Sequence, residues 1–223
     1  MASITLESLR IEPKTTADSA VILMHGLGAD GYDFESLVPE LHLPVEPSIR
    51  WIFPHAPFRP VTVNAGAEMR AWFDITSLDG EADEDEAGIR ESAAAIGELV
   101  RAEREAGIRA DRILLAGFSQ GGAMALFTAF RWPEHLAGAV ALSCWLPLAG
   151  TLTAEAHRAN TALPVFMAHG VMDPMVAMGL AERSKDLLRA KGYPVTWLTY
   201  PMAHTLCSAE VTDMREWMLG VLC

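Results

Sequence analysis

The sequence predicts an α/β fold, in which helices cover both faces of a mainly parallel central sheet. Short apolar runs alternate along the chain with segments of helical periodicity, which is the pattern that such folds show. Most of these runs are apolar at every position rather than at every second one, as expected of parallel strands buried on both faces. The chain has 223 residues without a repeat or a low-complexity linker, so we expect a single domain over residues 1–223 and no separate cap domain.

The expected strands are short and separated by helical or loop segments. A first strand near residues 4–11 alternates apolar and polar side chains, which suits the edge of a sheet. The more continuous apolar runs follow at Ala20–Met24, Trp51–Phe53, Ile113–Ala116, Ala139–Leu142, Val165–Ala168 and Val195–Tyr200.

Four helices are expected, at Glu86–Glu105, Gly121–Arg131, Met178–Ala190 and Ser208–Leu222. The first carries its apolar side chains on one face and is followed by Gly107, a residue type that commonly ends helices. Ser208 is the expected N-cap of the last helix.

An acidic run precedes the first of these helices. Six of the eight residues of Asp79–Glu86 are acidic. We expect a solvated loop there that leads into the helix N-terminus, where negative charge is favourable. A cation site is the alternative, but consecutive carboxylates lack the spacing of a calcium-binding loop.

Charge and composition argue against several classes of function. Lys and Arg number 17 against 29 Asp and Glu, and the net charge of −12 argues against a nucleic-acid partner, which needs clustered basic residues. The same charge gains nothing from anionic lipid, so no stable membrane association is expected. The N-terminus does not resemble a signal peptide, and no apolar stretch reaches the roughly 20 residues of a membrane span, which predicts a cytoplasmic protein. The three cysteines, Cys144, Cys207 and Cys223, are expected to be reduced thiols without a metal.

The strongest functional motif is Gly117-Phe-Ser-Gln-Gly121, a G-x-S-x-G sequence. It directly follows an apolar strand and directly precedes a helical segment, the strand–turn–helix setting that a nucleophile elbow requires. The glycines allow a tight turn that presents the hydroxyl of Ser119 clear of the backbone. A helix start with a capping serine is the structural alternative.

A serine hydroxyl needs a base, and His204 is the expected one. In this type of fold the order along the chain is serine, acid, histidine, so the choice lies among the histidines after Ser119. His204 follows the last apolar strand at its carboxyl end, the rim of the sheet where the serine also lies. The other histidines of this part of the chain, His135, His157 and His169, are expected to have surface or structural roles.

The expected acid is Asp173, which follows the strand that ends near Ala168. Asp111 precedes the nucleophile strand and lies at the opposite rim, and Asp213 falls inside the final helix. The role of Asp173 would be to hold His204 in one tautomer and to stabilise its cationic form. A turn-forming Asp before Pro174 is the structural alternative.

An oxyanion hole needs two main-chain N–H groups aimed at the developing charge. One is expected from Gln120, the residue after the serine, and the other from the loop after an early strand. The segment Met24-His-Gly-Leu-Gly-Ala-Asp-Gly31 fits this second place, with the N–H of Leu27 as the donor. A plain glycine-rich turn is the alternative for this loop.

Taken together, these residues resemble the phospholipase/carboxylesterase group of α/β hydrolases, which includes small bacterial carboxylesterases and acyl-protein thioesterases. The resemblance covers nearly the whole chain. It rests on Leu23–Gly31, Phe53–Pro57, Ala71–Asp74, Ala116–Met124, Leu142-Ser143 with Leu146-Pro147, His169–Asp173 and Tyr200–His204.

The resemblance implies an α/β-hydrolase fold and a set of site residues. These are a catalytic triad of Ser119, Asp173 and His204, an oxyanion hole at Leu27 and Gln120, and an acyl site bordered by Trp72, Phe73 and Trp145. Similar proteins need neither a cofactor nor a metal, and some are dimers, so a homodimer is one expected assembly.

We therefore expect a carboxylesterase that hydrolyses small-molecule esters of short to medium acyl chain through an acyl-enzyme intermediate. An acyl-protein thioesterase or lysophospholipase uses the same machinery, and the sequence does not separate it from an esterase. Non-hydrolytic acyl transfer or lyase chemistry, and a non-catalytic binding protein on the same fold, are remoter alternatives.

Overall fold

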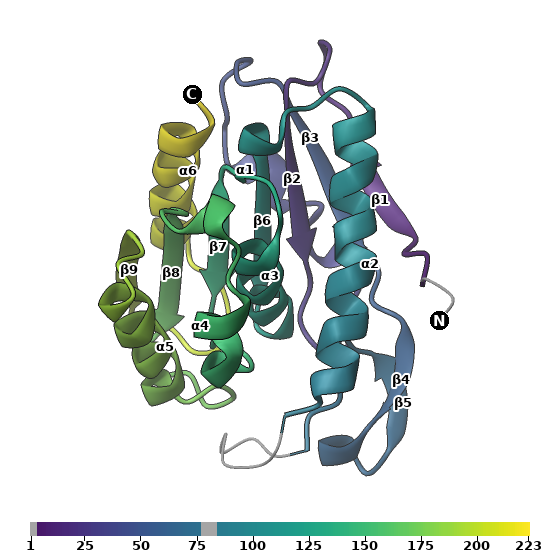
Figure 1. The fold of residues 1–223 in the computed structure, drawn as a ribbon, viewed down its shortest axis with the longest axis vertical. Coiled ribbons are helices and arrows are strands. Elements are labelled where there is room, and N and C mark those ends of the chain that lie inside the picture. The colour runs from purple at the N-terminus through teal and green to yellow at the C-terminus, as the bar shows by residue number, and fades with distance from the viewer. Residues whose placement is uncertain (1–3, 77–83) are drawn as a thin grey trace.

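The computed structural model describes residues 4–76 and 84–223 and contains a seven-stranded sheet (Figure 1). The order across the sheet is β1-β3-β2-β6-β7-β8-β9. The strands are β1 (Ser8–Ile11), β2 (Ser19–Met24), β3 (Ile49–Pro54), β6 (Ile113–Phe118), β7 (Gly138–Leu142), β8 (Val165–Gly170) and β9 (Val195–Tyr200).

All neighbouring strands of this sheet pair in parallel except β1, which pairs antiparallel with β3 at one edge. The continuously apolar strands β2, β7 and β8 are buried at every position, because helices cover both of their faces. The expected fold class, a mainly parallel sheet between helices, is confirmed.

The helices are α1 (Leu37–Glu40), α2 (Glu86–Glu105), α3 (Gln120–Arg131), α4 (Leu152–Glu155), α5 (Met178–Ala190) and α6 (Ser208–Leu222). Alternate side chains of the strands point to two separate cores. One core packs the sheet against α2, α3 and α5, and the other packs it against α1 and α6. In Figure 1, α2 and α3 cross in front of the sheet.

A small antiparallel hairpin of β4 (Phe58–Val61) and β5 (Ala67–Arg70) projects from the main sheet below α2 (Figure 1). Short 3₁₀ segments lie at Gly31–Phe34, Thr62–Asn64, Ala110–Arg112, Ala149–Thr151 and Arg158–Asn160. Within residues 4–76 and 84–223 nothing forms a separate cap domain, and no helix is both long and apolar enough to cross a membrane.

Because β2, β6, β8 and β9 run parallel, the loops that follow their carboxyl ends lie along one edge of the sheet. Those loops carry Leu27, Ser119, Asp173 and His204 respectively. The topology therefore brings together residues that are far apart in the sequence.

Candidate active site

Ser119 stands at the turn between β6 and α3. Its φ of 54° and ψ of −123° lie where residues with a Cβ are rarely found. A Cβ added to Gly117 would lie 2.2 Å from the backbone of Gly121, and one added to Gly121 would lie 2.2 Å from the carbonyl oxygen of Met24. The two glycines therefore let α3 pack directly on the ends of β6 and β2, which holds Ser119 at the edge of the sheet.

His204 and Asp173 form a close pair beside the serine. The distance from His204 Nδ1 to Asp173 Oδ2 is 2.6 Å, and the carboxylate side chain is fully buried. The His204 ring packs on Phe118 with ring centres 4.6 Å apart. Ser119 and His204 line the same cavity. Within the described residues the serine hydroxyl makes no hydrogen bond to His204, a contact that often tightens only when substrate binds.

The loop that carries Asp173 is held by several hydrogen bonds. Asp173 Oδ1 accepts the main-chain N–H groups of Met175 and Val176 at 2.8 and 2.9 Å. The buried ring of His169 places Nε2 3.0 Å from the Val176 carbonyl and 3.5 Å from Asp173 Oδ2. Burial by itself would raise the pKa of Asp173, but the hydrogen bonds from Val176, His204 and Met175 outweigh it and lower that pKa. The carboxylate therefore stays ionised beside the imidazole.

The two residues expected to form the oxyanion hole, Leu27 and Gln120, lie on segments next to the serine. Leu27 lines the cavity in the turn after β2, and within the described residues its N–H has no protein acceptor. Gln120 begins α3, and the first N–H groups of a helix have no intrahelical acceptor. A Cβ on Gly26 would lie 3.4 Å from the Cβ of Ser119, so this turn passes directly beside the serine.

The cavity at this edge has a volume of about 1100 Å³ and a mixed wall. Most of the surface that lines it is apolar. Apolar side chains from the segment after the hairpin, from the loops after β7 and β8 and from α5 contribute to it, among them Phe73, Ile75, Trp145, Leu146, Leu148, Val176, Leu180 and Leu187. Acidic side chains, Asp33, Asp74, Glu84 and Glu86, also line it, together with Arg183. Such a space suits an apolar acyl group better than a charged small molecule.

The three predicted acyl-site aromatics have different positions. Phe73 and Trp145 line the cavity and meet edge to face, with ring centres 6.1 Å apart. Trp72 is fully buried and does not line the cavity, so the structure places it in the core instead. Its indole N–H donates to the His25 carbonyl at 2.9 Å, and its main-chain N–H donates to the side chain of Gln120 at 2.7 Å.

The described part of the chain does not assemble groups for metal or thiol chemistry at this site. Among residues 4–76 and 84–223, no cluster of three or more His, Cys, Asp or Glu side chains is placed to hold a metal ion. The three cysteines are free thiols. Cys144 is buried, and burial raises the pKa of its thiol, so it stays protonated and is a poor nucleophile.

The chain is similar to known proteins over nearly its whole length. The sequence model of the phospholipase/carboxylesterase family matches residues 7–221. The chain belongs to this family. It is therefore an α/β hydrolase, and the resemblance stated from the sequence motifs is confirmed.

Among its relatives, acyl-protein thioesterase 1 of Neurospora crassa is 39% identical over 98% of this chain and 93% of that protein. Acyl-protein thioesterase 1 of Cryptococcus neoformans is 36% identical over 98% of both chains. The crystal structure of Zea mays acyl-protein thioesterase 2 has a TM-score of 0.87 and 32% identity, covering 97% of this chain and 99% of that one.

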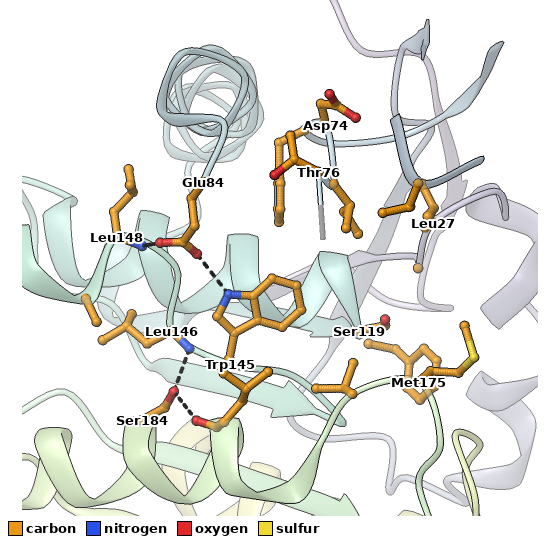
Figure 2. Close-up of a pocket in the computed structure, with 18 of the residues that line it drawn as sticks. Leu27, Asp74, Thr76, Glu84, Ser119, Trp145, Leu146, Leu148, Met175 and Ser184 are labelled. Carbon is orange, nitrogen blue, oxygen red and sulfur yellow. Dashed lines mark hydrogen bonds between the residues drawn. The ribbon is translucent and has the colours of Figure 1, made fainter. Parts of the chain in front are cut away.

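Glu84 lines the cavity but was not among the site residues predicted from the sequence. Glu84 belongs to the acidic run for which we expected only a solvated loop; residues 77–83 of that run lie outside the described residues. Its carboxylate instead accepts the indole N–H of Trp145 at 2.9 Å and the main-chain N–H of Leu148 at 2.6 Å (Figure 2). The next residue, Asp85, is the N-cap of α2, and its side chain accepts a hydrogen bond from the main-chain N–H of Gly88.

Proposed function

We propose that this chain is a serine thioesterase that hydrolyses acyl thioesters and cleaves carboxylic esters by the same route. The observation that carries the proposal is the 2.6 Å hydrogen bond between His204 and Asp173, with Ser119 on the wall of the same apolar cavity. This is the arrangement of nucleophile, base and orienting acid that acyl transfer needs.

In the proposed reaction, the Nδ1–H of His204 donates a hydrogen bond to Asp173, which leaves Nε2 free to accept a proton. The Ser119 oxygen attacks the acyl carbonyl carbon as its proton passes to His204. The resulting oxyanion accepts hydrogen bonds from the main-chain N–H groups of Leu27 and Gln120. The carbonyl then re-forms, the bond to sulfur or oxygen breaks, and His204 returns the proton to the departing thiol or alcohol.

Water completes the cycle. His204 removes a proton from water, which attacks the acyl-serine carbonyl. The carboxylic acid leaves, and the proton returns to the oxygen of Ser119. No step in this sequence needs a metal or a redox group.

Two observations favour thioesters of larger acyl groups over simple short-chain esters as the main substrates. Relatives that align with nearly the whole chain bear the name acyl-protein thioesterase. The cavity, about 1100 Å³ in volume and lined largely by apolar side chains, also suits a larger acyl group than acetate. The carboxylesterase expected from the sequence is the second candidate, and the description of the family, phospholipase/carboxylesterase, favours it.

A matched pair of substrates tests the choice. One peptide carries an S-octanoyl cysteine, and its twin carries an O-octanoyl serine at the same position. We expect kcat/KM for the thioester to exceed that for the ester by at least about tenfold. Equal values, or a faster ester, would favour the carboxylesterase instead.

The controls test the nucleophile itself. Ser119→Ala should lower both activities by at least roughly a thousandfold, because triad losses cost several orders of magnitude. A fluorophosphonate probe should label the wild-type chain at Ser119 and leave the variant unlabelled. A variant that keeps more than a tenth of either activity would show that another group forms the acyl-enzyme.

A further inference from the structure

Glu84 connects two parts of the cavity wall that are distant in the sequence. It lies just before α2, and it binds Trp145 and Leu148 in the loop after β7, although Trp145 is 61 positions away in the sequence. The two bonds use both carboxylate oxygens, Oε1 to the indole N–H and Oε2 to the main-chain N–H. Hydrogen bonds to an ionised carboxylate are among the stronger ones in proteins.

The loop that Glu84 holds is also strained and held from the opposite side. Leu148 has φ 48° and ψ 43°, a left-handed conformation that residues with a branched side chain seldom adopt. The main-chain N–H of Leu146 donates to Ser184 Oγ of α5 at 2.9 Å. The loop is therefore fixed between α5 and the segment before α2, with the Trp145 ring projecting into the cavity.

The position of this bridge suggests what it does. In Figure 2 the Trp145 ring lies between Ser119 and the Glu84 carboxylate, and Leu148 lies beyond the ring. The cavity wall also includes the next three residues of the loop, Ala149, Gly150 and Thr151. An acyl chain that is attached at Ser119 and extends along this wall meets the bridged Trp145 first.

We propose that Glu84 is a specificity-determining residue that limits the length of the acyl chain, by fixing Trp145 and Leu148 across the cavity. This inference rests on the proposed function, because it assigns the size of the acyl group in that reaction. With the bridge intact, the cavity accepts a medium chain. Without it, the Trp145 ring can swing aside and the strained loop can relax, so that a longer chain fits.

The turnover experiment compares octanoyl and palmitoyl thioesters of one peptide, below their micelle concentrations. Each newly buried methylene contributes about fourfold in kcat/KM, equivalent to about 0.8 kcal/mol. If the bridge blocks at least two methylenes, Glu84→Ala should raise the palmitoyl-to-octanoyl ratio of kcat/KM by roughly tenfold or more.

Two further variants dissect the bridge. Trp145→Phe lacks the indole N–H but leaves Leu148 bound, so it should shift the ratio less than Glu84→Ala does. Glu84→Gln has a single acceptor oxygen and should also be intermediate, and it serves as the test if Glu84→Ala does not fold. Glu98→Ala removes an equal charge from the exposed face of α2, where Glu98 contacts Arg101, and should leave the ratio unchanged.

Binding of the free fatty acids to Ser119→Ala protein separates this inference from the proposed function. Calorimetry should show that adding Glu84→Ala strengthens palmitate binding relative to octanoate binding, whether or not the enzyme turns over thioesters. A binding shift without wild-type turnover would refute the thioesterase and retain the bridge. Wild-type turnover with an unchanged ratio in both folded Glu84 variants, or an equal shift in Glu98→Ala, would overturn the role of Glu84.

Discussion

The indole N–H of Trp72 donates to the main-chain carbonyl of His25 at 2.9 Å, and the two rings lie 5.4 Å apart. His25 begins the turn that contains Leu27. Its ring accepts the main-chain N–H of Ala56 at Nε2 and lies 2.7 Å from the Gly26 carbonyl at Nδ1. Burial lowers the pKa of His25 to about 4, so the neutral ring supports this turn at neutral pH. Trp72 therefore supports the proposed oxyanion hole from behind.

This arrangement predicts how a variant at Trp72 behaves. Trp72→Phe keeps an aromatic side chain but leaves the His25 carbonyl without its donor, which costs about 1 kcal/mol, or about fivefold in rate. We expect kcat/KM to fall by about this factor for octanoyl and palmitoyl substrates alike. Phe73→Leu is the matched comparison, because Phe73 does line the cavity and its loss should depend on chain length. A chain-length-dependent effect of Trp72→Phe would mean that Trp72 contacts the acyl group after all.

The pair of Asp173 and His204 gives a second prediction. In Asp173→Asn, the oxygen must stay on the side that accepts the N–H groups of Met175 and Val176. The amide NH₂ then donates to His204 Nδ1, so the imidazole proton moves to Nε2. In this tautomer Nε2 can no longer accept the proton of Ser119. We expect kcat to fall by roughly a thousandfold or more, with little change in KM.

The control for that variant is Asp213→Asn. Asp213 was one of the competing acids in the sequence, and it accepts the Tyr200 hydroxyl at 2.7 Å, a role that an amide oxygen can keep. It should retain nearly full activity. Stopped-flow and steady-state assays of both variants, with circular dichroism of each, check the assignment, and a near-wild-type Asp173→Asn would refute it.

Glycine packing at the elbow gives a third prediction. Gly121→Ala would bring its Cβ to 2.2 Å from the Met24 carbonyl oxygen. Because this neighbour is backbone, the clash can be relieved only if α3 moves away from β2. We expect a loss of about 3 kcal/mol in the free energy of unfolding, at the upper end of overpacking effects. Gly220→Ala in α6 is the control, since nothing lies within 4 Å of the added Cβ. That change should stabilise the helix by about 0.5–1 kcal/mol, and urea denaturation of both variants measures the difference.

The long elements of the fold could be predicted from the sequence because their patterns are local. The bounds of α2 and α5 match the expected ones, since apolar periodicity and a following glycine mark both helices. The hairpin of β4 and β5 was not expected, because its short strands are largely exposed and carry no apolar alternation. Ser208 was expected to cap α6, but the N-cap in the structure is Cys207. The N-cap preferences of single residue types do not fix a helix end to within one residue.

The site residues that could be predicted are those tied to strand ends. Ser119, Asp173 and His204 lie near one another because the carboxyl ends of parallel strands lie along one edge of the sheet. This arrangement is a consequence of the fold class. Trp72 and Glu84 could not be placed in this way. An aromatic residue beside a loop fits a core and a cavity equally well, and a carboxylate in an acidic run shows no sign of a partner 61 residues away.

A fourth prediction concerns Glu210, in the first turn of α6. Its side chain is fully buried, and within the described residues neither carboxylate oxygen has a hydrogen-bond partner. Burial raises the pKa of Glu210 from 4.5 to about 7; the nearby main-chain amide of Cys207 opposes this shift without forming a well-aligned hydrogen bond. Between pH 4.5 and about 7, Glu210 therefore keeps its proton in the folded chain and loses it in the unfolded chain.

The direction of the pH effect follows from this raised pKa. Below pH 4.5 both states hold the proton, so burial of the neutral acid costs least and stability is fully present. As the pH rises from 4.5 to about 7, Glu210 loses its proton in the unfolded chain but keeps it in the folded chain, so the free energy of unfolding falls. The total loss is on the order of 3 kcal/mol, since each unit of pKa difference corresponds to about 1.4 kcal/mol.

Glu210→Gln removes this titration while keeping nearly the same shape. The free energy of unfolding of the variant minus that of the wild type should therefore rise by about 3 kcal/mol between pH 4.5 and pH 8, with most of the rise below pH 7. Urea denaturation at several pH values measures this difference, in which the titrations of all other groups cancel. Gly220→Ala changes no titratable group, so it is the control and should give a difference that does not depend on pH. Parallel stability curves for Glu210→Gln and the wild type would mean that Glu210 is ionised in the folded chain, with a partner or a solvent path that the buried geometry does not provide.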